Sequence, residues 1–282
     1  MNLKSVLFVF LQYCLPQRLL TYFLGCLAEC RIPWIKNSLI GWFIKKYQVD
    51  LSLAEKTHID DYIHFNDFFT RRLKSDSRPF SNEPNLIISP ADGSISASGD
   101  IVNNQLFQAK NYYYSLEALV SNASNSIPFE NGKFITIYLS PRDYHRIHMP
   151  LSGKLLKTLY IPGKLFSVNA ASAEKIPNLF TRNERLVCLF DTEFGKMAVI
   201  MVGAMIVAGI STVWAGKMKP LPIHSIQTTE FNTIQLIRGD EMGAFYLGST
   251  VILLFESKTA LKWHSPPLLH RPIKMGETLG SF

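Results

Sequence analysis

Apolar positions in the first 74 residues recur at a helical spacing. Residues 1–50 place apolar and aromatic side chains between isolated charges, and the pattern continues through YQVDLSLAEKTHIDDYIHFNDFFTRRLK at 47–74 with a period near 3.6 residues. Residues 75–85 then bring Ser, Asp, Asn and two prolines, which is typical of a linker. The sequence therefore predicts a helical region over 1–74, a linker over 75–85 and a separate domain over 86–282.

The pattern changes after residue 86. Short apolar runs are separated by Gly, Pro, Asn and Asp, which is how a mainly antiparallel β core appears in sequence. Ser115 is a plausible N-cap for one helical turn over 116–119. We expect an α+β protein, with an N-terminal amphipathic helical segment followed by a β-rich catalytic core. The expected strands cover 86–88, 134–139, 155–161, 186–190, 197–202, 205–210, 233–237 and 251–255.

Composition supports one catalytic-sized domain with a smaller appendage. The chain has 282 residues, 47% of them apolar and 18% charged, which is typical neither of a disordered chain nor of a polytopic membrane protein. Its cysteines form neither a disulfide framework nor a CxxC metal motif, and this favours a reducing compartment. They are Cys14, Cys26, Cys30 and Cys188.

Positive charge is concentrated at the N-terminus. The chain carries a formal charge of +7, and residues 1–50 hold six basic residues against two acidic ones. Because these charges stand among large apolar side chains, the segment is unlike a nucleic-acid-binding arm and suits an anionic membrane surface. The six basic residues are Lys4, Arg18, Arg31, Lys36, Lys45 and Lys46.

The N-terminal segment is expected to lie on a membrane and not to cross it. Its longest uncharged stretch, 5–17, is shorter than the roughly 18 residues that a spanning helix needs. No small-residue signal-peptidase site follows it. Two or three interfacial helices are predicted, with Trp34, Trp42 and Tyr47 at headgroup level. A helical bundle packed on the core is the alternative.

Three stretches carry candidate chemistry. Asp92 lies in SPADG, Asp143, His145 and His148 lie in SPRDYHRIHMP, and Ser249 follows Gly248 in an otherwise apolar run. Each stretch has a structural alternative: a hairpin turn for Asp92, core histidines for the second stretch and a β-bulge for Gly248 and Ser249. Two histidines and an aspartate could also bind a metal, but no HExxH or third ligand at a familiar spacing accompanies them, so we predict no metal.

Asp92, His148 and Ser249 together form a possible proton relay. In such a relay the imidazole accepts the hydroxyl proton, and the carboxylate fixes the tautomer of the imidazole. Ser249 lacks the GxSxG sequence around the nucleophile of an α/β-hydrolase. Gly248 can adopt backbone conformations that other residues resist, and its carbonyl lies directly beside the Ser249 hydroxyl group.

At these residues the sequence resembles the phosphatidylserine decarboxylase family in its bacterial and mitochondrial form. The matching blocks span residues 65–251, so the membrane role of the first 50 residues rests mainly on composition. They are FNDFFTR (65–71), SPADG (89–93), AKNYYYSLEALV (109–120), YLSPRDYHRIHMP (138–150), NERLV (183–187), VGAMIVAG (202–209), VWAG (213–216) and GDEMGAFYLGSTV (239–251).

The resemblance implies that the chain cuts itself between Gly248 and Ser249. The products would be a β chain (1–248) and an α chain (249–282) that form a heterodimer, with Ser249 converted into a pyruvoyl group. Family roles carried onto this sequence make His148 the base for the Ser249 hydroxyl, with Asp92 orienting it. His145 becomes the proton donor during decarboxylation through a Schiff base, and Asp143 orients a histidine.

The implied reaction converts phosphatidylserine to phosphatidylethanolamine and CO2, with the pyruvoyl group as the only cofactor. The expected location is the cytoplasmic face of a bacterial inner membrane, as a peripheral protein that binds an anionic surface and no nucleic acid. A higher homo-oligomer is left open. Rival readings are a serine hydrolase that keeps Ser249 intact, a non-catalytic membrane-binding module, and a pyruvoyl enzyme acting on a soluble amino acid.

Overall fold

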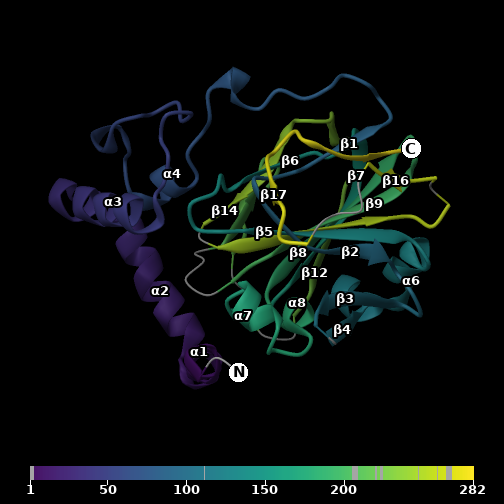
Figure 1. The fold of residues 1–282 in the computed structure, drawn as a ribbon, viewed down its shortest axis with the longest axis horizontal. Helices are drawn as coiled ribbons and strands as arrows, with labels where there is room; N and C mark the ends of the chain where they lie inside the picture. Colours follow the sequence, from purple (N-terminus) through teal and green to yellow (C-terminus); the bar gives the residue numbers. More distant parts are fainter. Residues whose placement is uncertain are drawn as a thin grey trace.

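The computed structural model describes residues 3–110, 112–204, 209–219, 221–222, 225–246, 248–258, 260–264 and 269–282. The N-terminal helices lie to one side of a β-rich body formed by the later residues (Figure 1). Every pairing between named strands in the described ranges is antiparallel. The predicted α+β class, with helices first and an antiparallel core second, is confirmed.

Three helices make up the N-terminal region: α1 (Leu3–Cys14), α2 (Gln17–Ala28) and α3 (Pro33–Tyr47). Prolines separate them, because Pro16 precedes α2 and Pro33 opens α3 where its missing N–H costs no hydrogen bond. No single helix among the described residues is long and apolar enough to cross a membrane. Ser5–Cys14 and Gln17–Ala28 reach that length and apolarity only as a pair, which is bent by 93°.

Residues 48–74 correct the prediction of a continued helical region. They contain only the short helices η1 (Ile59–Asp61) and α4 (Phe65–Phe69), and η2 (Ser75–Ser77) follows. The aromatic side chains pack on α3 instead, with the ring centroids of Phe65 and Phe68 at 5.0 and 5.9 Å from that of Phe43. Tertiary packing on α3 thus replaces the stabilisation that a longer helix would need. Residues 78–85 have no regular secondary structure.

The strands supply the scaffold of the molecule. Their bounds are β1 (Leu86–Ile88), β2 (Gly93–Asp100), β3 (Gln105–Ala109), β4 (Tyr112–Ser115), β5 (Lys133–Leu139), β6 (Arg146–His148), β7 (Gly153–Ile161), β8 (Arg185–Thr192), β9 (Gly195–Val202), β10 (Ile210–Thr212), β11 (Gly216–Lys217), β12 (Gln227–Glu230), β13 (Gln235–Leu236), β14 (Glu241–Phe245), β15 (Ser249–Phe255), β16 (Lys262–Trp263), β17 (Pro272–Ile273) and β18 (Thr278–Ser281).

Among the described residues these strands form four sheets. A nine-stranded sheet has the order β12-β7-β8-β9-β15-β5-β2-β17, with β13 also paired to β7. A four-stranded sheet has the order β11-β10-β14-β6, a three-stranded sheet the order β1-β18-β16, and β3 pairs with β4. The strand expected over 205–210 falls mostly outside the described residues, and only two residues of the one expected over 233–237 are paired as β13. The other six expected strands are present.

The short helices of the body are α5 (Leu116–Val120), α6 (Ala123–Ser126), η3 (Ile127–Phe129), α7 (Ala170–Ala173) and α8 (Leu179–Arg182). The predicted Ser115 cap is confirmed, because the Ser115 hydroxyl accepts a hydrogen bond from the Ala118 N–H at 3.2 Å.

The centre of the nine-stranded sheet is buried on both faces. Along β15, Val251 and Leu253 belong to one apolar cluster, whereas Ile252 and Leu254 belong to the cluster on the opposite face. All seven residues of β15 are buried as a result. This two-sided burial explains why the sequence is continuously apolar here instead of alternating.

Two glutamines attach the N-terminal helices to the β-rich body. The side chain of Gln12 accepts a hydrogen bond from the Ser167 N–H at 2.7 Å, and that of Gln17 accepts one from the Leu165 N–H at 2.8 Å. Both glutamines are buried. The junction between α1 and α2 is therefore held against the body.

Candidate active site

The Gly248–Ser249 bond lies where the chain passes from one sheet to another. β14 belongs to the four-stranded sheet, and β15 begins at Ser249 in the middle of the nine-stranded sheet, paired with Leu139 of β5. Gly248 has φ +52°, in the left-handed region, and a Cβ there would meet no atom within 4 Å. Leu247 lies outside the described residues. Gly248 is thus a junction between two strands of different sheets and not a bulge within one strand.

The Ser249 hydroxyl is buried and has no hydrogen-bond partner among the described residues. Side chains alternate along a strand, so Ser249 faces the same side as Val251, which packs with Ile147 of β6 and Met242 of β14. Ser249 therefore faces the layer between the two sheets, and β6 with its preceding loop carries both candidate histidines. A buried hydroxyl without a partner is costly in a core, and it marks this serine as unusual.

His145 is completely buried in the loop before β6. Its Nδ1 lies 2.8 Å from the Asp143 carbonyl oxygen, which can only accept, so Nδ1 carries the proton. Its Nε2 has no partner among the described residues, and the ring centroid lies 4.1 Å from that of Phe69. Burial lowers the pKa of His145 to about 3, so the imidazole is neutral with a bare Nε2 at physiological pH.

His148 has the same tautomer but a different partner. Its Nδ1 donates to the Gly239 carbonyl oxygen at 2.7 Å, and its Nε2 accepts from the Tyr144 hydroxyl at 2.8 Å. Burial lowers the pKa of His148 below its ordinary value, against the opposing effect of the Gly239 carbonyl. Both imidazoles are therefore neutral bases, but the basic nitrogen of His148 is occupied.

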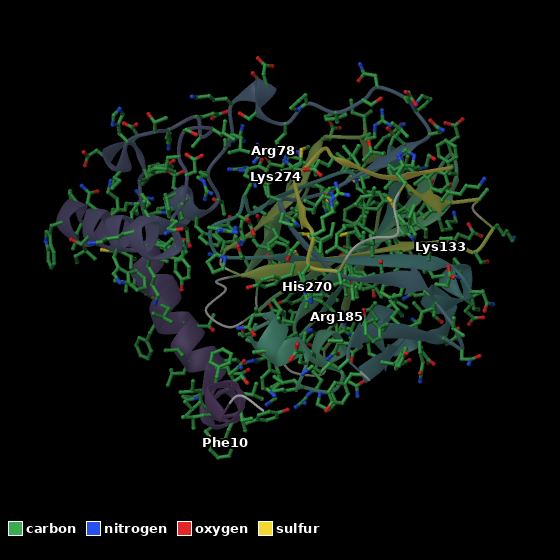
Figure 2. The ribbon with its side chains drawn as sticks, in the orientation of Figure 1. Phe10, Arg78, Lys133, Arg185, His270 and Lys274 are labelled. Carbon is green, nitrogen blue, oxygen red and sulfur yellow. The ribbon has the colours of Figure 1, made fainter. Side chains whose placement is uncertain are left out.

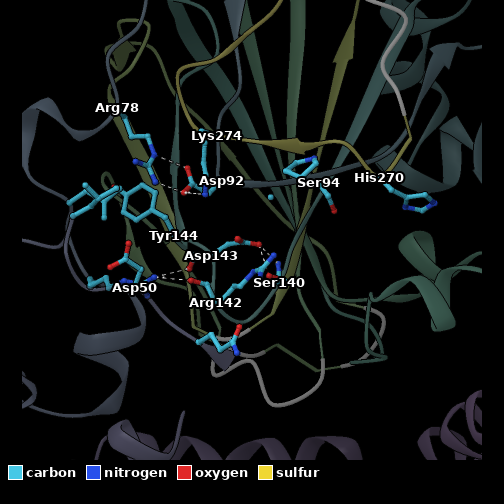
Figure 3. A pocket seen from close by; sticks show the side chains of 16 residues that line it. Asp50, Arg78, Asp92, Ser94, Ser140, Arg142, Asp143, Tyr144, His270 and Lys274 are labelled. Atoms are coloured by element: carbon cyan, nitrogen blue, oxygen red, sulfur yellow. Dashed lines mark hydrogen bonds and ion pairs between the residues drawn. The ribbon is translucent and has the colours of Figure 1, made fainter. Parts of the chain in front are cut away.

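Asp92 lies in the turn between β1 and β2, beside the histidine strand. The His148 N–H donates to the Pro90 carbonyl at 2.8 Å, so the turn and β6 are adjacent. The Asp92 carboxylate accepts from Arg78 Nε at 2.9 Å, from the Met275 N–H at 2.9 Å and from Lys274 Nζ at 3.3 Å. Figure 3 shows Arg78 and Lys274 converging on it. Asp92 makes no hydrogen bond to His148 in the described structure.

The charge state of Asp92 follows from these contacts. Burial would raise its pKa, but the hydrogen bonds from Arg78 and Met275 and the nearby positive charges outweigh burial, so its pKa is lowered. Asp143 contributes differently. Its carboxylate accepts from the Ser140 N–H and hydroxyl, both at 2.7 Å, while its backbone carbonyl holds His145.

Sequence reasoning missed several residues of this site. Tyr144 and Gly239 lie inside the blocks that carry the family resemblance, yet their hydrogen bonds to His148 have no signature in sequence. Arg78 and Lys274 lie outside those blocks and are separated from Asp92 by 14 and 182 positions. Among the described residues, no group of three or more His, Cys, Asp or Glu is placed to hold a metal ion.

A buried serine thus follows a left-handed glycine, and β6 with the loop before it carries two neutral histidines. The comparisons with known proteins identify the family. The family model described as phosphatidylserine decarboxylase matches residues 65–281, and a second one, described as PSD, matches residues 7–48. The chain belongs to the phosphatidylserine decarboxylase family. The second match extends the resemblance into the N-terminal region, where the sequence blocks had not carried it.

Curated relatives cover nearly the whole chain. A protein named phosphatidylserine decarboxylase proenzyme from Ectopseudomonas mendocina (strain ymp) is 49% identical over 285 residues, covering 99% of each chain. Proteins of the same name from Pseudomonas fluorescens (strain Pf0-1) and Pseudomonas aeruginosa (strain LESB58) are 50% and 49% identical. They cover 98% and 99% of this chain, and each is itself covered over 98% of its length.

Proposed function

We propose that this protein converts phosphatidylserine to phosphatidylethanolamine and CO2 after cutting its own chain between Gly248 and Ser249. The observation that carries the proposal is the similarity over nearly the full chain to proteins named phosphatidylserine decarboxylase proenzyme. The buried, unpartnered Ser249 hydroxyl beside the carbonyl of a left-handed glycine supports it. The two products, residues 1–248 and 249–282, would stay together because β15 is hydrogen-bonded to β5 and β9 on either side.

Self-cleavage balances as an acyl transfer followed by an elimination. The Ser249 hydroxyl loses its proton to a base, and its oxygen attacks the Gly248 carbonyl carbon. The base returns the proton to the amide nitrogen, which leaves as a free amine, so that an ester joins the two residues. Loss of the Ser249 α-proton then expels the Gly248 carboxylate and leaves dehydroalanine. Water converts this residue to a pyruvoyl group and ammonia.

His148 is proposed as the base for this step, with Asp92 beside it. Its neutral Nδ1–H tautomer supports a basic role, and Tyr144 would have to release Nε2 before Ser249 could reach it. The arginine and lysine on Asp92 keep its carboxylate ionised, so its negative charge would stabilise an imidazolium nearby. Removing a positioned base typically slows a reaction by about 10²–10⁴-fold.

His145 is proposed for the decarboxylation that follows. A pyruvoyl group at position 249 supplies a carbonyl that takes up the substrate amino group and accepts the electrons of the breaking C–C bond. The Nε2 of His145 is buried without a partner among the described residues, and Asp143 orients the ring through its backbone carbonyl. His145 would first bind a proton at Nε2 and then return it to the substrate carbon.

The N-terminal helices are proposed to hold the enzyme on the cytoplasmic face of a bacterial inner membrane as a peripheral protein. Large apolar side chains are exposed along α1–α3, and Phe10 points away from the body (Figure 2). They include Leu7, Phe10, Leu19, Tyr22, Phe23, Trp34 and Trp42. Exposed residues of this kind next to basic residues suit the interface of an anionic membrane.

One experiment separates this proposal from its rivals. Purified protein is incubated with phosphatidylserine vesicles, CO2 release is measured, and the same sample is analysed by denaturing mass spectrometry. We expect two chains that end and begin at residues 248 and 249, and activity that is destroyed by borohydride. A single full-length chain that an acyl-phosphonate labels at Ser249 would instead indicate a serine hydrolase and overturn the proposal.

A further inference from the structure

A polar cavity lies between the N-terminal region and the β-rich body. Its volume is about 410 Å³, and its walls come from the segment after α3 with Arg71, Leu73 and Arg78 on one side, and from β2, the 140–144 loop and residues 270–274 on the other. Figure 3 shows Arg142, Asp143, Tyr144 and Lys274 around it. The cavity therefore lies between the N-terminal region and the loop that carries the active-site residues.

Arg71 in the wall of this cavity is buried but incompletely bonded. Its side chain is only 5% exposed, and its Nη2 donates to the carbonyl oxygens of Arg142 at 2.9 Å and Asp143 at 3.4 Å. Its Nε and Nη1 have no hydrogen-bond partner, and no carboxylate lies within ion-pair distance of Arg71 among the described residues. A buried cation that lacks hydrogen-bond and ion-pair partners costs free energy unless a ligand supplies those partners.

Arg185 is a useful contrast, because this chain does satisfy another buried arginine. Arg185 is 3% exposed, and its Nε, Nη1 and Nη2 all donate to backbone carbonyl oxygens, at 2.6–3.1 Å. Arg185 is thus a structural arginine that needs no ligand. Arg71 instead lies in the wall of a cavity, and its Nε and Nη1 lack such partners among the described residues, which indicates a binding role.

The carboxylates around the cavity are already engaged. Asp92 is held by Arg78 and Lys274, Asp143 accepts two hydrogen bonds from Ser140, and Asp50 accepts two from Ser52. Arg142, whose side chain is exposed, adds positive charge to the lining. Burial lowers the pKa of Arg71, against the opposing charges of Tyr62, Asp92 and Asp143. The cavity therefore suits an incoming anion.

The cavity is near the reacting residue. Ser140 in its lining directly follows Leu139, which is the partner of Ser249 across the β5–β15 pair. Neighbouring strands are about 4.8 Å apart and consecutive Cα atoms about 3.8 Å apart. The Cα atoms of Ser140 and Ser249 are therefore roughly 6–9 Å apart. The phosphorus of a phosphoserine headgroup stands four bonds from its amino nitrogen, which is a comparable span.

We propose that Arg71 binds the phosphodiester of the phosphatidylserine headgroup, an inference that rests on the proposed function. The substrate has two anions, and the phosphodiester is the better choice. A cation on the departing carboxylate would stabilise the ground state more than the transition state, in which that charge is dispersed, and would slow the reaction. A guanidinium also remains charged when buried, and it is a common donor to phosphate oxygens in proteins.

The test uses two soluble inhibitors of the processed enzyme. sn-Glycero-3-phosphoethanolamine has the phosphodiester and no carboxylate, whereas ethanolamine has neither. In Arg71→Met we expect the inhibition constant of the first to rise about 10- to 100-fold and that of the second to stay unchanged, because a hydrogen-bonded charge contact is lost. Arg72→Met is the matched control, since Arg72 is exposed and does not line the cavity. Arg71→Lys should give a smaller rise.

Two results would overturn this proposal alone. Either both inhibitors weaken equally in Arg71→Met, or neither weakens, while the wild-type protein still releases CO2 from phosphatidylserine. If Arg71→Met fails to cut itself, calorimetric binding of sn-glycero-3-phosphoethanolamine is compared in the uncut Ser249→Ala protein with and without Arg71→Met. Equal affinities there count against the proposal. A wild-type protein that releases no CO2 counts against the proposed function instead.

Discussion

The N-terminal helices and the centre of the nine-stranded sheet depart from ordinary burial in opposite directions. α1–α3 expose large apolar side chains, with Trp34 73% and Tyr22 67% exposed, whereas the sheet buries the polar Ser249 and Thr250 completely. Neither arrangement helps a soluble domain to fold, because exposed apolar area and unpartnered buried hydroxyls both cost free energy. The proposed function explains both arrangements, through membrane contact for the helices and chemistry for Ser249.

The contrast extends to charged residues. Lys36 was counted among the basic residues of a membrane-facing surface, but it is buried, and its Nζ donates to the carbonyl oxygens of Ile59, Asp60 and Tyr62 at 2.6–3.4 Å. It attaches α3 to the η1 segment. A basic residue in an apolar helix is therefore not by itself evidence of membrane contact.

The largest expected effect is the difference between removing the hydroxyl of Ser249 and removing that of Thr250, both buried in β15. Ser249→Ala should abolish both chain cleavage and CO2 release, because it removes the proposed nucleophile and the source of the pyruvoyl group. Thr250→Val is the matched control, since its Oγ1 is also buried without a partner among the described residues. That variant should cut itself normally. Gel electrophoresis measures chain cleavage in both variants. Cleavage of the Ser249→Ala protein would contradict the proposed site.

The two histidines should differ in the stage that they affect. His148→Gln should slow self-cleavage by about 10²–10⁴-fold, the typical contribution of a positioned base. His145→Gln should cut itself and then release CO2 slowly. Time courses of cleavage and of CO2 release measure the two stages separately. The reverse result, with His145→Gln uncut, would assign the cleavage base to the histidine whose Nε2 is bare.

The pH dependence of self-cleavage sharpens the same comparison. A base acts in its neutral form, and the lowered pKa of His148 keeps it neutral at pH values below the ordinary 6.5. The cleavage rate should therefore stay constant from pH 8 to 6.5 and decline only below the lowered pKa. Cleavage of denatured precursor during refolding at several pH values checks this. A rate already halved at pH 6.5 would argue against His148 as the base.

Membrane binding should depend on the exposed face of the helices and not on exposed apolar residues in general. A triple change of Phe10, Phe23 and Trp34 to Ser should weaken binding to anionic vesicles by at least about 100-fold, from roughly 1–2 kcal/mol for each buried ring. Ile127→Ser is the control, because Ile127 is 63% exposed on the β-rich body. Vesicle sedimentation measures both, and equal losses would contradict the assignment.

The smallest expected effect concerns the attachment of the helices to the body. Gln12→Met keeps the length of the side chain but leaves the Ser167 N–H without its partner, which should cost about 1–2 kcal/mol. We expect faster hydrogen exchange in α1, by about 5- to 30-fold, with the β core unchanged. Gln105→Met changes an exposed glutamine and should leave exchange in α1 as it was.

What the sequence determined by itself was local or periodic. The continuous apolar runs predicted the buried strands, Ser115 predicted its helix cap, and the matching blocks placed Asp92, His145, His148 and Ser249 together as one candidate site. These features depend on a few neighbouring residues, so they can be read from a short window. The helical prediction for 48–74 was wrong because aromatic packing on α3, a distant element, decided the conformation there.

Only the tertiary structure decided the hydrogen-bond partners. Asp92 is held by Arg78 and Lys274, His148 by Gly239 and Tyr144, and Arg71 is left with two open nitrogens beside a cavity. Periodicity cannot specify such contacts, because each depends on where two remote backbones meet to within an ångström. The passage of the chain from the four-stranded to the nine-stranded sheet at Gly248 was likewise set by the register of strands far apart in sequence.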